Sequence, residues 1–307
     1  MTSEHLSYFV ARGETRSLTD STRLGLRGSF IHLSDGVTHY ELSGRSDGEI
    51  VLLMPTLMAP LFYWDQFARW LHAMGLRTLT YSAYGSGYSD RVSGQYGPAL
   101  FVRQAQELLT KLGLHEVHHV IGASLGAVVA MDFLQKMRCR TSTRTLTLVG
   151  PIGVTSRFPF LAYVARNKVL AQIVGPGLGW VGTEYQVKKS VRASEHAALL
   201  KQMMDESSCY EGSTYALLST LRAFSSINQQ ALYLQASRLS IPILLLWGEE
   251  DRMAPARNQG EAKSLLQPVY VRLIPECGHM AAFERSDLVA RVFSFFRKST
   301  QMSFGLI

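Results

Sequence analysis

Hydrophobic and polar positions along this chain follow two alternating patterns. Short apolar runs of strand length recur at residues 50–54, 77–81, 118–122, 145–149, 241–247 and 269–274. Between them lie segments whose apolar residues have helical spacing, clearest at 100–112 and 124–137. Residues 29–33 and 37–41 flank Ser34-Asp35-Gly36, which predicts two short strands joined by a tight turn. Strands that alternate with helices predict an α/β fold, with a mostly parallel, doubly wound sheet covered on both faces.

The alternation is interrupted once. Between residues 151 and 240 helical patterns follow one another without a strand pattern. We expect residues 151–240 to form a helical cap, inserted into a core made of residues 28–150 and 241–307. Residues 1–27 are polar and are expected to form an N-terminal leader outside that core.

Composition and charge narrow the classes of function. The 307 residues are 47% hydrophobic and 18% charged, and the net charge of +7 is not gathered into a basic run interleaved with aromatics, which argues against a nucleic-acid partner. The longest uncharged stretches are too short to span a bilayer, and the first thirty residues hold no apolar signal segment, so we expect a cytoplasmic protein. Cys139, Cys209 and Cys277 lack the spacing of a disulfide framework or a metal site. A small-molecule substrate is the expected partner, and the oligomeric state is open between monomer and homodimer.

The strand predicted before residue 124 leads into a motif that carries chemistry. Gly122-Ala123-Ser124-Leu125-Gly126 stands between an apolar strand and a helix rich in small residues. This is the context of a nucleophile elbow, in which a serine sits at a strained strand-to-helix turn and the flanking glycines allow close backbone approach. The alternative is a glycine-rich turn without catalytic function. The strand and helix on its two sides favour Ser124 as a nucleophile.

Two later strand ends supply the partners that a serine nucleophile requires, in the order acid then histidine. The strand at 241–247 leads into Gly248-Glu-Glu-Asp251, and the strand at 269–274 leads into a loop that ends Gly278-His279. Asp251 is preferred to Glu249 and Glu250 because the turn after the glycine must bring a short carboxylate back to the histidine. The sequence therefore predicts a triad of Ser124, His279 and Asp251.

Four segments carry a resemblance to a known family. The segments that carry the resemblance are residues 30–41, Tyr84-Gly-Ser-Gly-Tyr-Ser-Asp-Arg91, the elbow, and residues 247–255. The chain resembles bacterial α/β-hydrolases close to the monoacylglycerol lipase and C–C bond (meta-cleavage product) hydrolase groups. The resemblance covers about residues 28 to 298. It implies hydrolysis of a carboxylic ester, thioester, amide or carbon–carbon bond, with His279 as base, Asp251 orienting it, and no cofactor. A metal is not expected, because the histidines before the elbow strand lack carboxylate or cysteine partners at suitable spacing.

The chain departs from that family at two places. Met54 and Pro55 stand where relatives usually carry His-Gly, so the resemblance implies an oxyanion hole made by the backbone N–H of Leu125 and that of Thr56 or Leu57. Ser82 stands where relatives normally have an aspartate. It indicates either a changed structural hydrogen bond or a reshaped pocket floor.

Candidate substrate contacts come from the segment after the oxyanion loop and from the predicted cap. They are Met58, Phe62 and Trp64, with Trp180 among the cap aromatics. The leading hypothesis is an esterase or related acyl hydrolase for a small, mainly apolar substrate. A cyclase, lyase or C–C hydrolase using the same triad and a non-catalytic small-molecule receptor are the alternatives.

Overall fold

One mixed sheet runs through the molecule. In the computed structural model, which describes residues 8–56, 58–137, 142–151, 159–178, 187–255 and 258–304, this sheet has eight strands. They are β1 (Ser29–His32), β2 (Val37–Gly44), β3 (Ile50–Met54), β4 (Arg77–Tyr81), β5 (His119–Ala123), β6 (Thr145–Val149), β7 (Ile243–Gly248) and β8 (Tyr270–Ile274). Their spatial order is β1-β2-β4-β3-β5-β6-β7-β8. β2 pairs antiparallel with both β1 and β4, and all the other pairs are parallel.

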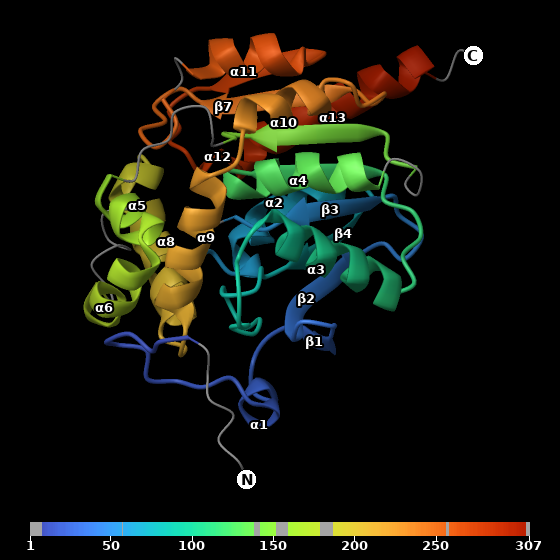
Figure 1. The fold of residues 1–307 in the computed structure, drawn as a ribbon. Helices are drawn as coiled ribbons and strands as arrows, with labels where there is room; N and C mark the ends of the chain where they lie inside the picture. Colours follow the sequence, from blue (N-terminus) through green and yellow to red (C-terminus); the bar gives the residue numbers. More distant parts are fainter. Residues whose placement is uncertain are drawn as a thin grey trace.

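Helices cover both faces of this sheet (Figure 1). On one face lie α3 (Pro98–Lys111), α4 (Leu125–Lys136) and α10 (Gln229–Ala236), and α4 packs against both of the others. On the other face α2 (Asp65–Ala73) packs against α13 (Ser286–Phe304). The remaining short elements of the core are the 3-10 turn η1 (Leu61–Trp64), α11 (Gln259–Leu266) and α12 (Ala281–Glu284), whereas α1 (Asp20–Arg23) belongs to the N-terminal segment.

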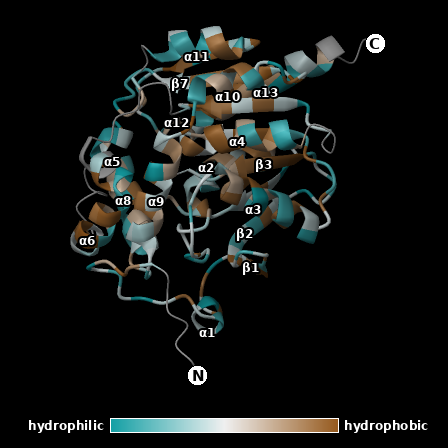
Figure 2. Cartoon of the chain, viewed as in Figure 1, coloured by the Kyte–Doolittle hydropathy of each residue, from teal (hydrophilic) through white to brown (hydrophobic). Residues whose placement is uncertain are grey.

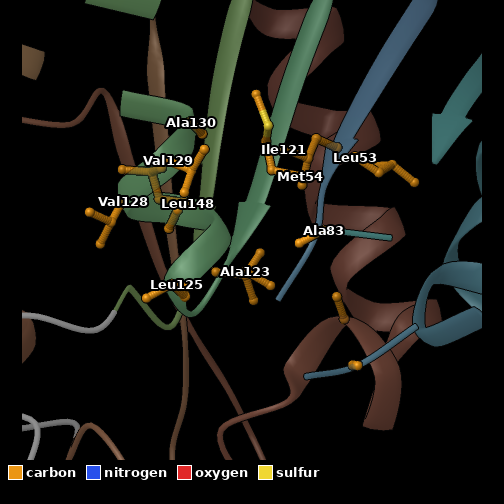
Figure 3. Close-up of a cluster of buried hydrophobic side chains, with 14 of the residues drawn as sticks. Leu53, Met54, Ala83, Ile121, Ala123, Leu125, Val128, Val129, Ala130 and Leu148 are labelled. Carbon is orange, nitrogen blue, oxygen red and sulfur yellow. The ribbon is translucent and has the colours of Figure 1, made fainter. Parts of the chain in front are cut away.

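Burial follows from this layering. Every residue of β5 and β6 is buried, as expected for parallel strands with helices on both faces. Figure 2 shows β3 as hydrophobic along its length, whereas hydrophilic residues are frequent on the outer helices. In Figure 3 Ile121 of β5 lies beside Met54 of β3, and Val129 of α4 lies near Leu148 of β6. The core is thus continuous up to the strand ends, where the candidate site begins.

Most of the remaining helices come from the segment between β6 and β7. They are α5 (Pro159–Arg166), α6 (Lys168–Leu178), α8 (Ser194–Ser208) and α9 (Ser213–Ser225). These four gather at one end of the molecule, on the left in Figure 1, and α9 packs against α5, α6 and α8. We refer to these four helices as the helical insert. α10 also follows β6 but lies on α4.

The described part of the N-terminal segment runs along the helical insert (Figure 1). Arg12 N–H donates to Pro176 O at 2.8 Å, and Arg16 N–H donates to Cys209 O at 3.0 Å. The buried carboxylate of Glu14 accepts hydrogen bonds from the backbone N–H groups of Ala11, Gly212 and Thr214. Gly212 is the N-cap of α9, so Glu14 satisfies backbone donors at that helix start.

The predicted fold class is confirmed. Strands β3, β4 and β6 coincide with the predicted ranges, and β5, β7 and β8 differ at their ends by one or two residues. The predicted hairpin is present, with its second strand extended to Gly44. Among the described helices, none is long and apolar enough to cross a membrane.

Candidate active site

Ser124 stands between β5 and α4 in a strained backbone conformation. Its φ of 54° and ψ of −120° lie in a region that residues other than glycine rarely adopt. Two neighbouring glycines make this turn possible. A Cβ added at Gly122 would lie 2.4 Å from Gly126 O, and one added at Gly126 would lie 2.6 Å from Pro55 O. The turn therefore packs tightly against itself and against the loop after β3.

The structure brings Ser124, His279 and Asp251 together at three separate strand ends. His279 Nε2 lies 2.8 Å from Ser124 Oγ, and His279 Nδ1 lies 2.7 Å from Asp251 Oδ2. The other carboxylate oxygen of Asp251 accepts hydrogen bonds from Met253 N–H and Ala254 N–H, both at 2.8 Å. All three side chains are buried. Because a carboxylate accepts from Nδ1–H, the imidazole has Nε2 free to accept the serine proton.

The backbone N–H groups expected to act as oxyanion donors belong to Leu125 and to Thr56 or Leu57. Leu125 is the first residue of α4, and the N–H groups of a helix's first turn have no acceptor within the helix. Thr56 follows the Met54–Pro55 pair, whose carbonyl oxygens lie against Gly126. Leu125 and Thr56 line the same cavity. Leu57, the other predicted donor, lies outside the described residues.

A narrow, partly open cavity lies beside Leu125 and Thr56. Its wall is mainly apolar and comes from the loop after β3, the loop after β4, helices α3 and α4, and α9 of the helical insert. The lining residues are Pro55, Thr56, Met58, Ala83, Tyr84, Gly85, Ser86, Phe101, Leu125, Val129, Ala216, Leu217 and Thr220. Leu125 directly follows Ser124, so the cavity lies next to the elbow, and its mainly apolar wall suits an apolar ligand group.

The predicted substrate contacts are divided between this cavity and other places. Met58 lines the cavity and has a positive φ of 59°. Phe62 instead packs against His39, Tyr88 and the guanidinium of Arg27. Trp64 is buried against Tyr63 and Phe67. Neither Phe62 nor Trp64 lines the cavity, and Trp180 lies outside the described residues.

Ser82 takes part in a buried hydrogen-bond network and does not line the cavity. Its hydroxyl accepts from Leu61 N–H at 3.0 Å and lies 3.1 Å from His39 Nδ1. His39 Nε2 lies 2.8 Å from Arg27 O, which can only accept, so Nε2 carries the proton and Nδ1 accepts from Ser82. Burial lowers the pKa of His39 to about 4. Of the two explanations for Ser82, the structure favours the changed structural hydrogen bond.

Two buried charged residues near the site were missed by sequence reasoning. Arg91 donates to Gly87 O and Ser89 O and, across to the helical insert, to Ser207 O and Ser213 Oγ. Among the described residues, Glu284 accepts from the backbone N–H groups of Arg192, Ala193 and Gly278. Arg91 ends the motif Tyr84–Arg91 that carries the family resemblance, but the motif does not reveal its contacts. Its partners on the helical insert, like the Arg192 and Ala193 partners of Glu284, are distant in sequence.

Metal ligands are scarce at this site. Within the part of the chain that the structure describes, no three His, Cys, Asp or Glu side chains form a group that could hold a metal ion. The histidines nearest the elbow strand have other partners. His119 Nδ1 lies 2.7 Å from Thr145 Oγ1, and His118 Nδ1 accepts from Ile50 N–H at 3.0 Å.

Comparison with known proteins agrees with this fold. A family model described as "Alpha/beta hydrolase family" matches residues 51–292. Carboxylesterase YbfK of Bacillus subtilis (strain 168) is 22% identical over 272 residues, covering 87% of this chain and 86% of its own length. A thermophilic esterase from Thermogutta terrifontis has a TM-score of 0.74 at 19% identity, with 90% of this chain and 99% of that chain covered. The meta-cleavage product hydrolase CumD (A129V mutant) has a TM-score of 0.67 at 19% identity, with 88% and 98% covered. The resemblance that the motifs indicate is confirmed.

Proposed function

Because the chain belongs to the alpha/beta hydrolase family, we propose that it is a serine hydrolase that cleaves small, mainly apolar carboxylic esters or related acyl compounds. The observation that carries the proposal is the unbroken line of contacts from Ser124 Oγ through His279 to Asp251. Pure ligand binding gives no reason to bury these three side chains in hydrogen-bond contact, which supports catalysis over a receptor function.

The chemistry follows from the contacts. Ser124 Oγ attacks the acyl carbonyl carbon while its proton passes to His279 Nε2, and Asp251 stabilises the imidazolium that forms. The carbonyl oxygen becomes an oxyanion. When the tetrahedral intermediate collapses, the bond to the leaving alcohol breaks and the alcohol takes the proton from His279. Water then repeats the sequence on the acyl-enzyme, which releases the carboxylic acid and restores Ser124.

An oxyanion hole from Leu125 N–H and Thr56 N–H fits this sequence of steps. Pro55 has no N–H, but it stands before the proposed donor and does not replace it. The contact of Gly126 with Pro55 O supports a fixed distance between the two donors. Such donors act on charge that develops in the transition state and are worth roughly 10²–10³ in kcat each.

The cavity wall supports the substrate class. Its lining includes Phe101, Val129 and Leu217, none of which carries a charge or a hydrogen-bonding side chain. We also propose that the helical insert acts as the cap, with α10 belonging to the core, because Ala216, Leu217 and Thr220 of α9 line the cavity. This arrangement favours a short acyl chain that ends against α9.

A series of p-nitrophenyl esters tests the proposal, with acetyl, butyryl and octanoyl groups as substrates and Ser124→Ala as the control. The wild-type chain should hydrolyse the shorter esters best, and Ser124→Ala should lose turnover while it keeps its fold, because the hydroxyl adds little packing volume. Turnover by Ser124→Ala within about tenfold of wild type would contradict a covalent mechanism.

A further inference from the structure

The loop that carries His279 is tied to the helical insert by one buried carboxylate. Glu284, the last residue of α12, has 6% of its surface exposed. Its Oε2 accepts from Gly278 N–H at 3.0 Å, directly before His279. Its Oε1 accepts from Arg192 N–H at 2.8 Å and from Ala193 N–H at 3.1 Å. Ala193 is the N-cap of α8, so the two oxygens join the histidine loop to the start of that helix.

Backbone contacts around Glu284 leave this loop little freedom. Met280 N–H donates to Ser190 O at 3.0 Å, and a Cβ added at Gly278 would lie 2.9 Å from that same carbonyl oxygen. On its other side the loop packs against the acid turn, where Glu250 N–H donates to Cys277 O at 2.9 Å. The histidine loop is therefore held between the acid turn and the start of α8.

Backbone N–H groups stabilise the negative charge of the Glu284 carboxylate. Arg192, the nearby cation, forms its ion pair with Glu250 at 2.8 Å, and Glu284 accepts from N–H groups of residues 192, 193 and 278. A carboxylate oxygen is a stronger acceptor than a neutral one, and a buried N–H that loses its acceptor is costly. Any displacement of α8 relative to the core is thus transmitted to Gly278 and the adjacent His279.

We propose that Glu284 is a positioning residue for His279, which aligns the imidazole by fastening its loop to the first turn of α8. This inference rests on the proposed function, and it makes the alignment of the base depend on the position of the helical insert. Glu284 touches neither substrate nor the reacting atoms.

Glu14 offers a matched control within the same chain. It too is 6% exposed and accepts from three backbone N–H groups at the start of a helix of the insert, in this case α9. It has no link to the histidine loop. Glu14→Gln and Glu284→Gln each place an amide N–H₂ opposite a backbone donor, so both should lower the thermal midpoint of unfolding.

The two variants should differ in catalysis. With p-nitrophenyl acetate, Glu284→Gln should lower kcat on the order of 10–10²-fold with KM changed by less than about threefold, because the base is misplaced while the cavity is kept. Glu14→Gln should keep kcat within about twofold of wild type. The low-field proton NMR resonance of His279 Nδ1–H, bound to Asp251, should shift or vanish only in Glu284→Gln. Equal kcat values and equal resonances in the two variants would overturn the proposal.

Two outcomes of this experiment call for a further measurement or variant. If the wild-type chain fails to turn over the ester, the proposed function fails, and the resonance still decides the role of Glu284. If Glu284→Gln does not fold, Ala193→Pro replaces it, since the φ of −81° at Ala193 suits proline and only one N–H is removed. This variant should lower kcat by at least about threefold, and a wild-type kcat would overturn the inference.

Discussion

Replacement of Asp251 by asparagine should disable the base by changing which ring nitrogen carries its proton. One oxygen of Asp251 accepts from Met253 N–H and Ala254 N–H, and the other faces His279 Nδ1 at 2.7 Å. The asparagine oxygen will take the position that accepts from Met253 N–H and Ala254 N–H. The opposite orientation would leave these two buried donors unpaired, at a cost of about 1–3 kcal/mol each. Its N–H₂ group then faces Nδ1, which must become an acceptor.

This change of tautomer prevents His279 from accepting the proton of Ser124. With its proton on Nε2, the imidazole donates to Ser124 Oγ across their 2.8 Å contact and cannot accept the serine proton. A wrong tautomer of this kind costs about 10⁴ in kcat, which is about 5.4 kcal/mol of transition-state free energy at 1.36 kcal/mol per tenfold. The assay is kcat with p-nitrophenyl acetate for Asp251→Asn.

Glu249→Gln and Glu250→Gln are the matched controls, since they lie on the same turn. Glu249 is exposed, and Glu250 pairs with Arg192 at a partly exposed position, where an ion pair is worth about 0–1 kcal/mol. Both variants should keep kcat within about threefold of wild type. A loss below about 100-fold in Asp251→Asn, or a larger loss in Glu250→Gln, would refute the tautomer argument.

The remaining predictions concern stability and specificity. Burial lowers the pKa of His39 from 6.5 to about 4. As the pH falls, this imidazole is therefore protonated in the unfolded chain at a higher pH than in the folded chain. His39 should therefore contribute roughly 3 kcal/mol of stability above about pH 6.5 that is lost by about pH 4. Urea unfolding across this range should show a weaker pH dependence in His39→Gln, and an unchanged dependence would count against a buried neutral imidazole. Leu217→Ala should raise kcat/KM for the octanoyl relative to the acetyl ester by at least about tenfold, because it deepens the cavity. An unchanged ratio would indicate that the acyl chain binds outside this cavity.

The sequence predicts the fold because its signals are local. The strands end where apolar runs end, and β3, β4 and β6 coincide with those runs. β7 begins two residues later than predicted, at Ile243, directly after Pro242, which cannot donate to a ladder. Ser124, Asp251 and His279 each follow a strand end, so local motifs single out all three as candidates. Only the structure supplies their contacts.

What the sequence does not predict depends on chain reversals and on partners far apart. Phe62 and Trp64 follow the oxyanion loop, but the 3-10 turn at Leu61–Trp64 directs them to other contacts than the cavity. Glu284 meets backbone groups more than 90 residues earlier, and Glu14 meets groups almost 200 residues later. Any acidic residue can accept from a backbone N–H, so these positions have no residue pattern of their own.

The site of modification by a fluorophosphonate tests the proposed triad most directly. The reagent phosphonylates a serine that an adjacent base activates, and its anionic oxygen stands in for that of the tetrahedral intermediate. Peptide mass spectrometry after labelling should find the phosphonyl group on Ser124 in wild type, no adduct in Ser124→Ala, and slower labelling in Asp251→Asn. Absence of the adduct from Ser124 in the folded wild-type chain, or labelling that persists in Ser124→Ala, would contradict the account.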